Sequence, residues 1–164
     1  MPAMQRWAVF LLLSVSIAPS AVARTLQLED YYRVESASGP AISPDGRWVV
    51  FVRNSIIEAE NQRHTEIWMS PTDGSSPPVR LTSPAFNASA PKWSPDGKLV
   101  AFHSTRKAPG IEGDIWFLRM DQGGGEAFQI PGVSGAPIFS PDNHWIAFTK
   151  EDASSDPSTR VVAA

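Results

Sequence analysis

One pentapeptide comes close to the motif that presents a nucleophilic serine. Residues 132–136 read Gly-Val-Ser-Gly-Ala, which is the nucleophile elbow except that alanine fills the last place. The elbow needs glycine on both sides because its serine sits on a sharp strand-to-helix turn. No helical pattern follows Ser134, and a repeated phrase begins three residues later at Pro137. We therefore predict that Ser134 is a linker residue and that this chain carries no catalytic residue.

The other reactive side chains show no spacing typical of a metal or acid–base site. The three histidines are His64, His103 and His144. No common spacing would gather them around a metal ion. The three aspartates Asp45, Asp96 and Asp142 recur at corresponding places in predicted turns. Aspartate is a favoured turn residue, so the turns account for their presence. A calcium loop would need alternating carboxylates and a closing glutamate. Cysteine is absent, which excludes disulfides and thiol chemistry. We expect neither a metal nor a cofactor.

Composition places the chain among ordinary globular proteins. Of its 164 residues, 42% are apolar and 19% are charged. The formal net charge of −3 provides no basic surface, so nucleic acid is not an expected partner.

The first 23 residues follow the pattern of a secretory signal peptide. Arg6 supplies a positive start, residues 7–17 are apolar, and Ala21-Val22-Ala23 forms a small-x-small cleavage site. The apolar run is too short to span a bilayer of about 30 Å comfortably, although an uncleaved anchor is the alternative. We predict a periplasmic or secreted bacterial protein, because a secreted chain without cysteine makes no use of an oxidising compartment. No membrane span should remain after cleavage.

A twelve-residue phrase occurs three times, at residues 40–51, 91–102 and 137–148. Its Ser-Pro starts lie 51 residues (43 to 94) and 46 residues (94 to 140) apart, and periods of about 40 to 50 residues are typical of propeller blades. Each copy predicts a β-hairpin whose turn has proline, aspartate and then glycine in a left-handed conformation. The third copy has Asn143 instead of glycine, and asparagine tolerates that conformation well.

The strands around each turn complete a four-stranded unit. The strand after the turn is apolar without alternation, which indicates cover on both faces. A third strand follows at Glu66-Ile67-Trp68-Met69 and at Asp114-Ile115-Trp116-Phe117, and short fourth strands are expected at residues 79–82 and 127–130. Four strands per unit is the count of a propeller blade. The third unit should begin its third strand near Arg160, and the chain ends at Ala164.

These observations predict an all-β fold, an incomplete β-propeller of about three antiparallel blades. The expected organisation is a signal peptide at 1–23, a lead segment at 24–38 and a partial propeller at 39–164. Its blades would span approximately 39–83, 84–131 and 132–164, the last incomplete. Propellers typically have about four to eight blades, so we expect a piece of a longer protein.

The repeated phrase, followed by Asp-Ile-Trp, resembles the propeller of prolyl-oligopeptidase-family serine peptidases, especially the acylaminoacyl-peptidase and dipeptidyl-aminopeptidase branches. The lead segment at residues 25–32, with its Asp-Tyr pair, resembles the entry into their first blade. The resemblance implies a C-terminal α/β-hydrolase domain that carries the catalytic triad and acts on short peptides, with the propeller gating access. Some members hold the substrate amine with paired glutamates, but Glu58 and Glu60 do not match that motif.

TolB-like periplasmic propellers are the second resemblance, and the repeated phrase alone does not separate the two. They would imply a scaffold that binds envelope proteins. TolB proteins place an α/β domain before the propeller, and residues 24–38 are too few for one. The peptidase interpretation is therefore favoured.

Overall fold

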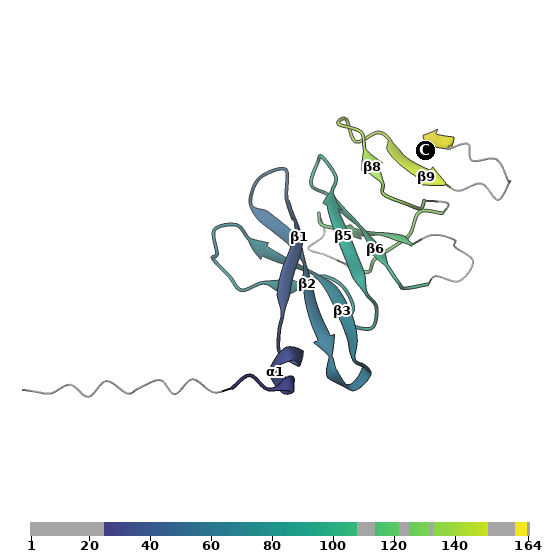
Figure 1. The fold of residues 1–164 in the computed structure, drawn as a ribbon. Coiled ribbons are helices and arrows are strands. Elements are labelled where there is room, and N and C mark those ends of the chain that lie inside the picture. Colours follow the sequence, from purple (N-terminus) through teal and green to yellow (C-terminus); the bar gives the residue numbers. More distant parts are fainter. Residues whose placement is uncertain (1–24, 108–113, 122–124, 132, 151–159, 164) are drawn as a thin grey trace, which may run out of the picture.

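The computed structural model describes residues 25–107, 114–121, 125–131, 133–150 and 160–163. This part of the chain forms antiparallel sheets that follow one another along the sequence, with one short α-helix at the N-terminal side (Figure 1). The chain is mainly β, as the sequence predicts. The predicted signal peptide at 1–23 lies outside the described residues. No helix in the described ranges is long and apolar enough to cross a membrane.

The first sheet has four strands in sequential order. They are β1 (Ser36–Ile42), β2 (Trp48–Ile57), β3 (Gln62–Pro71) and β4 (Val79–Arg80). The helix α1 (Leu28–Tyr32) lies in the predicted lead segment at 24–38, and it contacts β2. A single turn of 3-10 helix, η1 (Glu58–Glu60), links β2 to β3.

The second and third sheets each have three described strands. The second contains β5 (Ala88–Trp93), β6 (Leu99–Ser104) and β7 (Ile115–Arg119). The third contains β8 (Ile138–Phe139), β9 (Ile146–Lys150) and β10 (Arg160–Ala163), and β10 pairs with β9 where the sequence predicts a third strand. The fourth strand predicted at 127–130 is reduced to one bridge, in which Phe117 and Phe128 exchange bonds of 2.8 and 2.9 Å. Pro131, which lacks an N–H group, follows this short segment.

The three repeated turns have the same hydrogen bonds. In the first turn the Ser43 hydroxyl donates to Asp45 Oδ1 (2.5 Å) and accepts from the Trp48 N–H (2.9 Å). The same two bonds form from Ser94 and from Ser140. The turn residue after aspartate has a positive φ in every copy, at 72° for Gly46, 71° for Gly97 and 59° for Asn143. The predicted hairpins are therefore confirmed.

A β-bulge accommodates the proline that precedes each of the first two turns. The β1–β2 register shifts between Ser38 and Ala41, and the β5–β6 register shifts between Ser89 and Lys92. Proline within a sheet needs such a site because it cannot donate a ladder hydrogen bond. The residue before the proline takes a left-handed conformation, with φ of 55° at Gly39 and 51° at Ala90.

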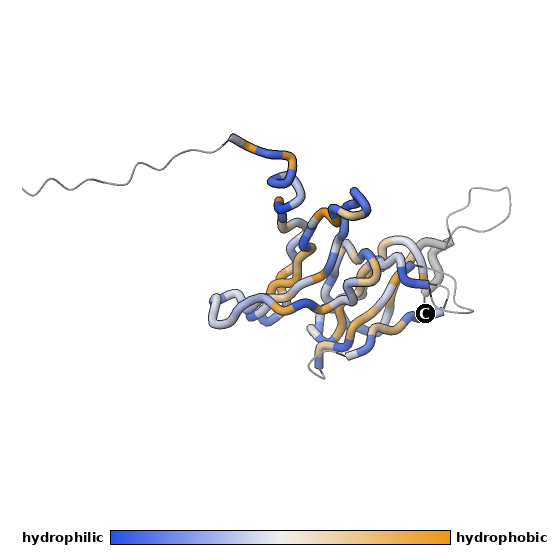
Figure 2. Tube along the Cα trace, turned by 90° about the horizontal axis from the view of Figure 1, so that it is seen from below, coloured by the Kyte–Doolittle hydropathy of each residue, from blue (hydrophilic) through white to orange (hydrophobic). Residues whose placement is uncertain are grey.

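Apolar side chains between successive sheets form two clusters. One face of the first sheet, with Val50 and Ile67, packs against Val100, Phe102, Trp116 and Leu118 of the second. The opposite face of the second sheet, with Ala101, Ile115 and Phe117, packs against Val133 and Phe148. The second sheet is thus covered on both sides, which explains its non-alternating strands. Figure 2 shows apolar colouring along the strands and polar colouring at many of the loops.

Polar contacts add to the packing between the first two sheets. The Trp93 indole N–H donates to the Ala41 carbonyl at 3.1 Å. Asn87, in the link between the sheets, accepts a bond from the Thr65 N–H at 2.9 Å. These bonds fix the second sheet against the first at both its inner strand and its connecting loop.

The turn aspartates should make stability depend on pH in the acid range. Hydrogen bonds, first from the serine hydroxyl, hold the pKa of Asp45, Asp96 and Asp142 below the ordinary value of 3.8. The unfolded chain therefore binds more protons than the folded chain as pH falls past that value, so the stabilisation is complete above about pH 5 and is lost below about pH 4. Urea denaturation at pH 3 to 7 should show this fall, and it should flatten when all three aspartates are replaced by asparagine. Exposed Glu60→Gln is the control; equal pH dependence in the triple variant and wild type would contradict the prediction.

Ala90→Gly should stabilise the chain. A left-handed conformation costs an L-residue about 1–2 kcal/mol, whereas glycine loses about 0.5–1 kcal/mol through backbone entropy. The difference favours glycine by about 0.5–1 kcal/mol, as Gly39 illustrates in the first copy. Ala88→Gly, at a position on the same strand that is 2% exposed, should destabilise instead. Urea midpoints of the two variants test this, and a loss of stability in Ala90→Gly would be the opposite result.

Candidate functional site

Ser134 lies in the segment that leads into the third sheet. Val133 before it is buried, Gly135 after it turns with φ of 72°, and β8 begins at Ile138. The described chain therefore enters a strand after this serine, whereas a nucleophile elbow would lead into a helix.

Each histidine pairs with a carboxylate of its own sheet. His64 Nε2 lies 3.6 Å from Glu66 Oε1, His103 Nδ1 lies 2.8 Å from Asp114 Oδ2, and His144 Nδ1 lies 3.5 Å from Asp142 Oδ2. The three pairs belong to different sheets, so they do not come together. In the described ranges no three metal-ligating side chains converge. Glu58 and Glu60 are exposed on η1.

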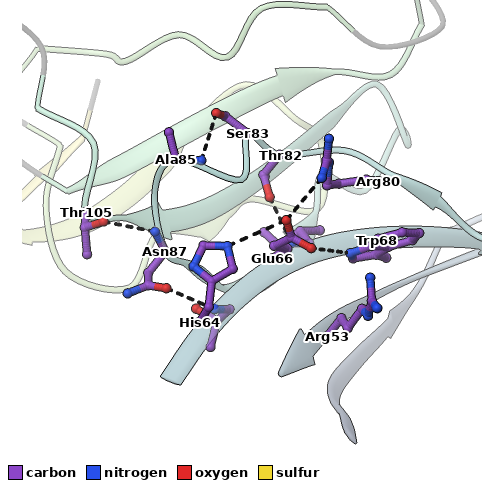
Figure 3. Close-up of polar contacts among 12 residues, drawn as sticks. Arg53, His64, Glu66, Trp68, Arg80, Thr82, Ser83, Ala85, Asn87 and Thr105 are labelled. Carbon is purple, nitrogen blue, oxygen red and sulfur yellow. Dashed lines mark hydrogen bonds and ion pairs between the residues drawn. The ribbon is translucent and has the colours of Figure 1, made fainter. Parts of the chain in front are cut away.

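Glu66 is a charged residue that is buried, with 7% of its surface exposed. Figure 3 shows its carboxylate surrounded by donors. The Trp68 indole N–H donates to Oε2 at 3.0 Å, and Arg80 Nη1 donates to Oε1 at 3.4 Å. His64 Nε2 approaches Oε1 at 3.6 Å and is buried without a hydrogen bond of its own. We call these four residues the Glu66 cluster.

Strand alternation brings the Glu66 cluster together. Side chains two residues apart on a strand share a face, which aligns His64, Glu66 and Trp68 on β3. Arg80 lies directly opposite Trp68 on β4. On the other side Arg53 lies opposite Glu66 on β2 and stacks over the Trp68 ring at 4.8 Å.

The chemistry of the Glu66 cluster is that of a charge-compensated anchor. A buried carboxylate is stable when cations and N–H donors satisfy it, and Arg80 and Trp68 do so here. Arg53 is held in turn by an ion pair with Glu35, which ties β2 to the segment before β1. The cluster therefore fixes the side chains on the face of the first sheet that points away from the second.

A signal for this cluster is present in the amino-acid sequence, but the repeat concealed it. Glu66-Ile67-Trp68 is interpreted as a strand because it corresponds to Asp114-Ile115-Trp116. A histidine two residues before Glu66 and an arginine on the next strand are the features that would have indicated a shared face.

A second polar group lies at one end of the second sheet. His103 on β6 has Ser89 directly opposite on β5 and Asp114 just before β7. A hollow of about 440 Å³ is lined by these three residues together with Asn87, Ser104, Thr105 and Lys107. Serine and histidine thus stand opposite each other on neighbouring strands, and the aspartate lies beside the histidine just before the third strand. Among the described residues, however, Ser89 makes no hydrogen bond to His103, which activation as a nucleophile requires.

Comparison with known proteins found no matching family model. The chain is 31% identical over 132 residues to the peptidase YuxL of Bacillus subtilis, a match that covers 77% of this chain and 19% of the relative. It is 30% identical over 141 residues to dipeptidyl-peptidase 5 of Porphyromonas gingivalis, covering 84% of this chain and 20% of the relative. The chain thus spans about a fifth of the length of these curated relatives.

Two solved structures share the fold. A TolB-like protein from Agrobacterium tumefaciens aligns with a TM-score of 0.51 and 26% identity, covering 77% of this chain and 44% of that one. Acylaminoacyl peptidase from Pyrococcus horikoshii aligns with a TM-score of 0.53 and 20% identity, covering 77% of this chain and 19% of that one. The chain is therefore similar to the propeller portion of prolyl-oligopeptidase-family serine peptidases, and TolB-like propellers are its second resemblance.

Proposed function

We propose that this chain is the N-terminal propeller portion of a secreted or periplasmic serine peptidase that acts on short peptides. Its role is to gate substrate access to an α/β-hydrolase domain that carries the catalytic triad. The similarity to peptidases named YuxL and dipeptidyl-peptidase 5 supports the peptidase assignment.

The face-to-face series of sheets is the observation that carries the gating role. Phe102 and Trp116 lie opposite each other in register and are only 3% and 4% exposed, because the first sheet covers them. Phe51 and Trp68 have the same register on the first sheet, on the face that points away from the second. A further sheet of the same kind fits that face, and sheets added in this way form a ring around a channel.

Secretion is supported by the N-terminal sequence. The positive start, the apolar run and the Ala21-Val22-Ala23 cleavage pattern are those of an export signal.

A TolB-like scaffold that binds envelope proteins is the second candidate. The match to the Agrobacterium protein favours it, because its 26% identity exceeds the 20% of the peptidase structure over the same share of this chain. The reading frame beyond codon 164 distinguishes the two. An α/β-hydrolase with a Gly-x-Ser-x-Gly motif supports the peptidase, and a frame that ends after further blades supports the scaffold.

The 164-residue chain alone should not hydrolyse acylated or proline-containing peptide substrates. A fluorophosphonate probe should label it no more than a Ser134→Ala variant, because Ser134 leads into a strand. The protein encoded by the full reading frame should react with the probe, and its turnover should fall steeply with peptide length if the propeller gates access. Labelling of the 164-residue chain that disappears in Ser134→Ala would contradict the assignment, and length-independent turnover would contradict gating.

A further inference from the structure

A groove lies between the first and second sheets at the end where the repeated turns are found. Figure 1 shows the β1–β2, β5–β6 and β8–β9 turns toward the same end of the molecule, away from α1. The groove has a volume of about 690 Å³, which lies within the range of ligand sites. Its lining is Ser43, Pro44, Asp45, Trp48, Met69, Trp93, Asp96, Gly97 and Met120. The Glu66 cluster and the His103 hollow contribute nothing to it.

The walls of the groove are aromatic and thioether side chains. The Trp93 indole N–H donates a hydrogen bond to the Ala41 carbonyl, which fixes the orientation of the ring. Trp48 is 37% exposed, and Met69 and Met120 supply polarisable, adaptable surface. Such walls suit a flexible aliphatic stem or a cation that stacks on an indole ring.

Asp45 gives this apolar groove a negative charge, which the neighbouring Arg47 attracts without forming an ion pair with it in the described part of the chain. Its Oδ1 accepts from the Ser43 hydroxyl and the Arg47 N–H. No hydrogen bond within the described part of the chain engages its Oδ2. The second carboxylate, Asp96, is different because its Oδ2 already lies 3.7 Å from Lys98 Nζ. A ligand cation would therefore pair with Asp45.

We propose that the groove binds an extended peptide through an arginine or lysine side chain. The methylene stem lies along Trp48 and Met69, and the cation reaches Asp45 Oδ2. Apolar walls together with an unpaired carboxylate match the two parts of such a side chain. The volume exceeds that of one side chain, so flanking residues of the peptide also fit. The proposal does not depend on the peptidase assignment.

The next pair of turns shows how the groove can be closed. Asn143 occupies the position of Gly97 in the third copy, and its Oδ1 accepts a bond from the Asp96 N–H at 3.1 Å. The Asn143 side chain therefore bridges the second and third turns. Gly97 leaves the corresponding bridge between the first and second turns unmade. A Cβ at Gly97 would lie 3.5 Å from Pro44 Cδ, an ordinary contact, and asparagine accepts the local φ of 71°.

Gly97→Asn is therefore a designed plug for the groove, with Gly46→Asn as its matched control. Gly46 has the same conformation, with φ of 72°, but a Cβ there would meet nothing within 4 Å. The probe is the blocked peptide acetyl-Ala-Leu-Arg-Leu-Ala-amide, and the comparison peptide has citrulline in place of arginine. Binding is followed by calorimetry and by the indole N–H resonances of Trp48 and Trp93.

We expect Gly97→Asn to weaken binding of the arginine peptide at least tenfold and Gly46→Asn to leave it unchanged. Asp45→Asn should weaken binding of the arginine peptide about fivefold, and the wild type should bind the citrulline peptide about fivefold more weakly than the arginine peptide. These two measurements test the proposal even if Gly97→Asn does not fold. Equal binding of the two peptides, or no binding of the arginine peptide to the wild type, would overturn the proposal. Self-association that Gly97→Asn abolishes, with peptide binding unaltered, would also overturn it by assigning the groove to a second copy of the chain.

Discussion

The hydroxyl of the serine that opens each repeated turn is the interaction on which the arrangement of the sheets depends. It donates to the turn aspartate and accepts from the first N–H of the next strand, so it closes the turn from both sides. Ser43 and Ser94 are buried, at 5% and 2% exposed. A buried hydroxyl with both hydrogen bonds made allows the hairpin only one register, because a register slip would leave the hydroxyl without partners. Since a slip of one residue exchanges the two faces of a strand, this turn also decides which side chains reach which neighbour.

The repeat made most of the backbone predictable. A proline, an aspartate and a residue that tolerates positive φ define one turn, and three copies at blade-like spacing define a series of sheets. The left-handed Ala90 could not be predicted in the same way. Its conformation follows from a bulge that the adjacent proline requires, and the residue type alanine does not indicate a left-handed conformation. The reduction of the fourth strand of the second sheet to one bridge could not be predicted either, because such short pairings depend on tertiary contacts more than on strand propensity.

Side-chain contacts between sheets were less accessible to sequence reasoning than the turns. Asn143 was explained by the turn conformation alone, yet its amide also bridges to the preceding turn. Glu66 was explained as a strand residue, yet it anchors Arg80, His64 and the Trp68 indole on one face. For both residues the role predicted within their own sheet is correct, but it omits a second role between neighbouring elements. Periodicity reports what a residue does within its own sheet, whereas these second roles require knowing which sheet lies beside it.

The interface between the first and second sheets differs from the interface between the second and third, because side chains at equivalent positions differ. Met69 and Phe117 occupy equivalent strand positions, and so do Gly97 and Asn143. At the second interface the Phe117 ring stacks on Phe128 at 5.7 Å and meets Phe139 edge-on at 6.5 Å. At the first interface Met69 and Gly97 are smaller or more flexible, and a groove remains between Trp48 and Trp93. Met69 and Phe117 do not set the strand register, and at the positions of Gly97 and Asn143 the turn requires only a residue that tolerates a positive φ. Sequence variation at such positions alters the space between sheets at little cost to the sheets themselves, so a repeat of this kind can acquire a binding site without changing its fold.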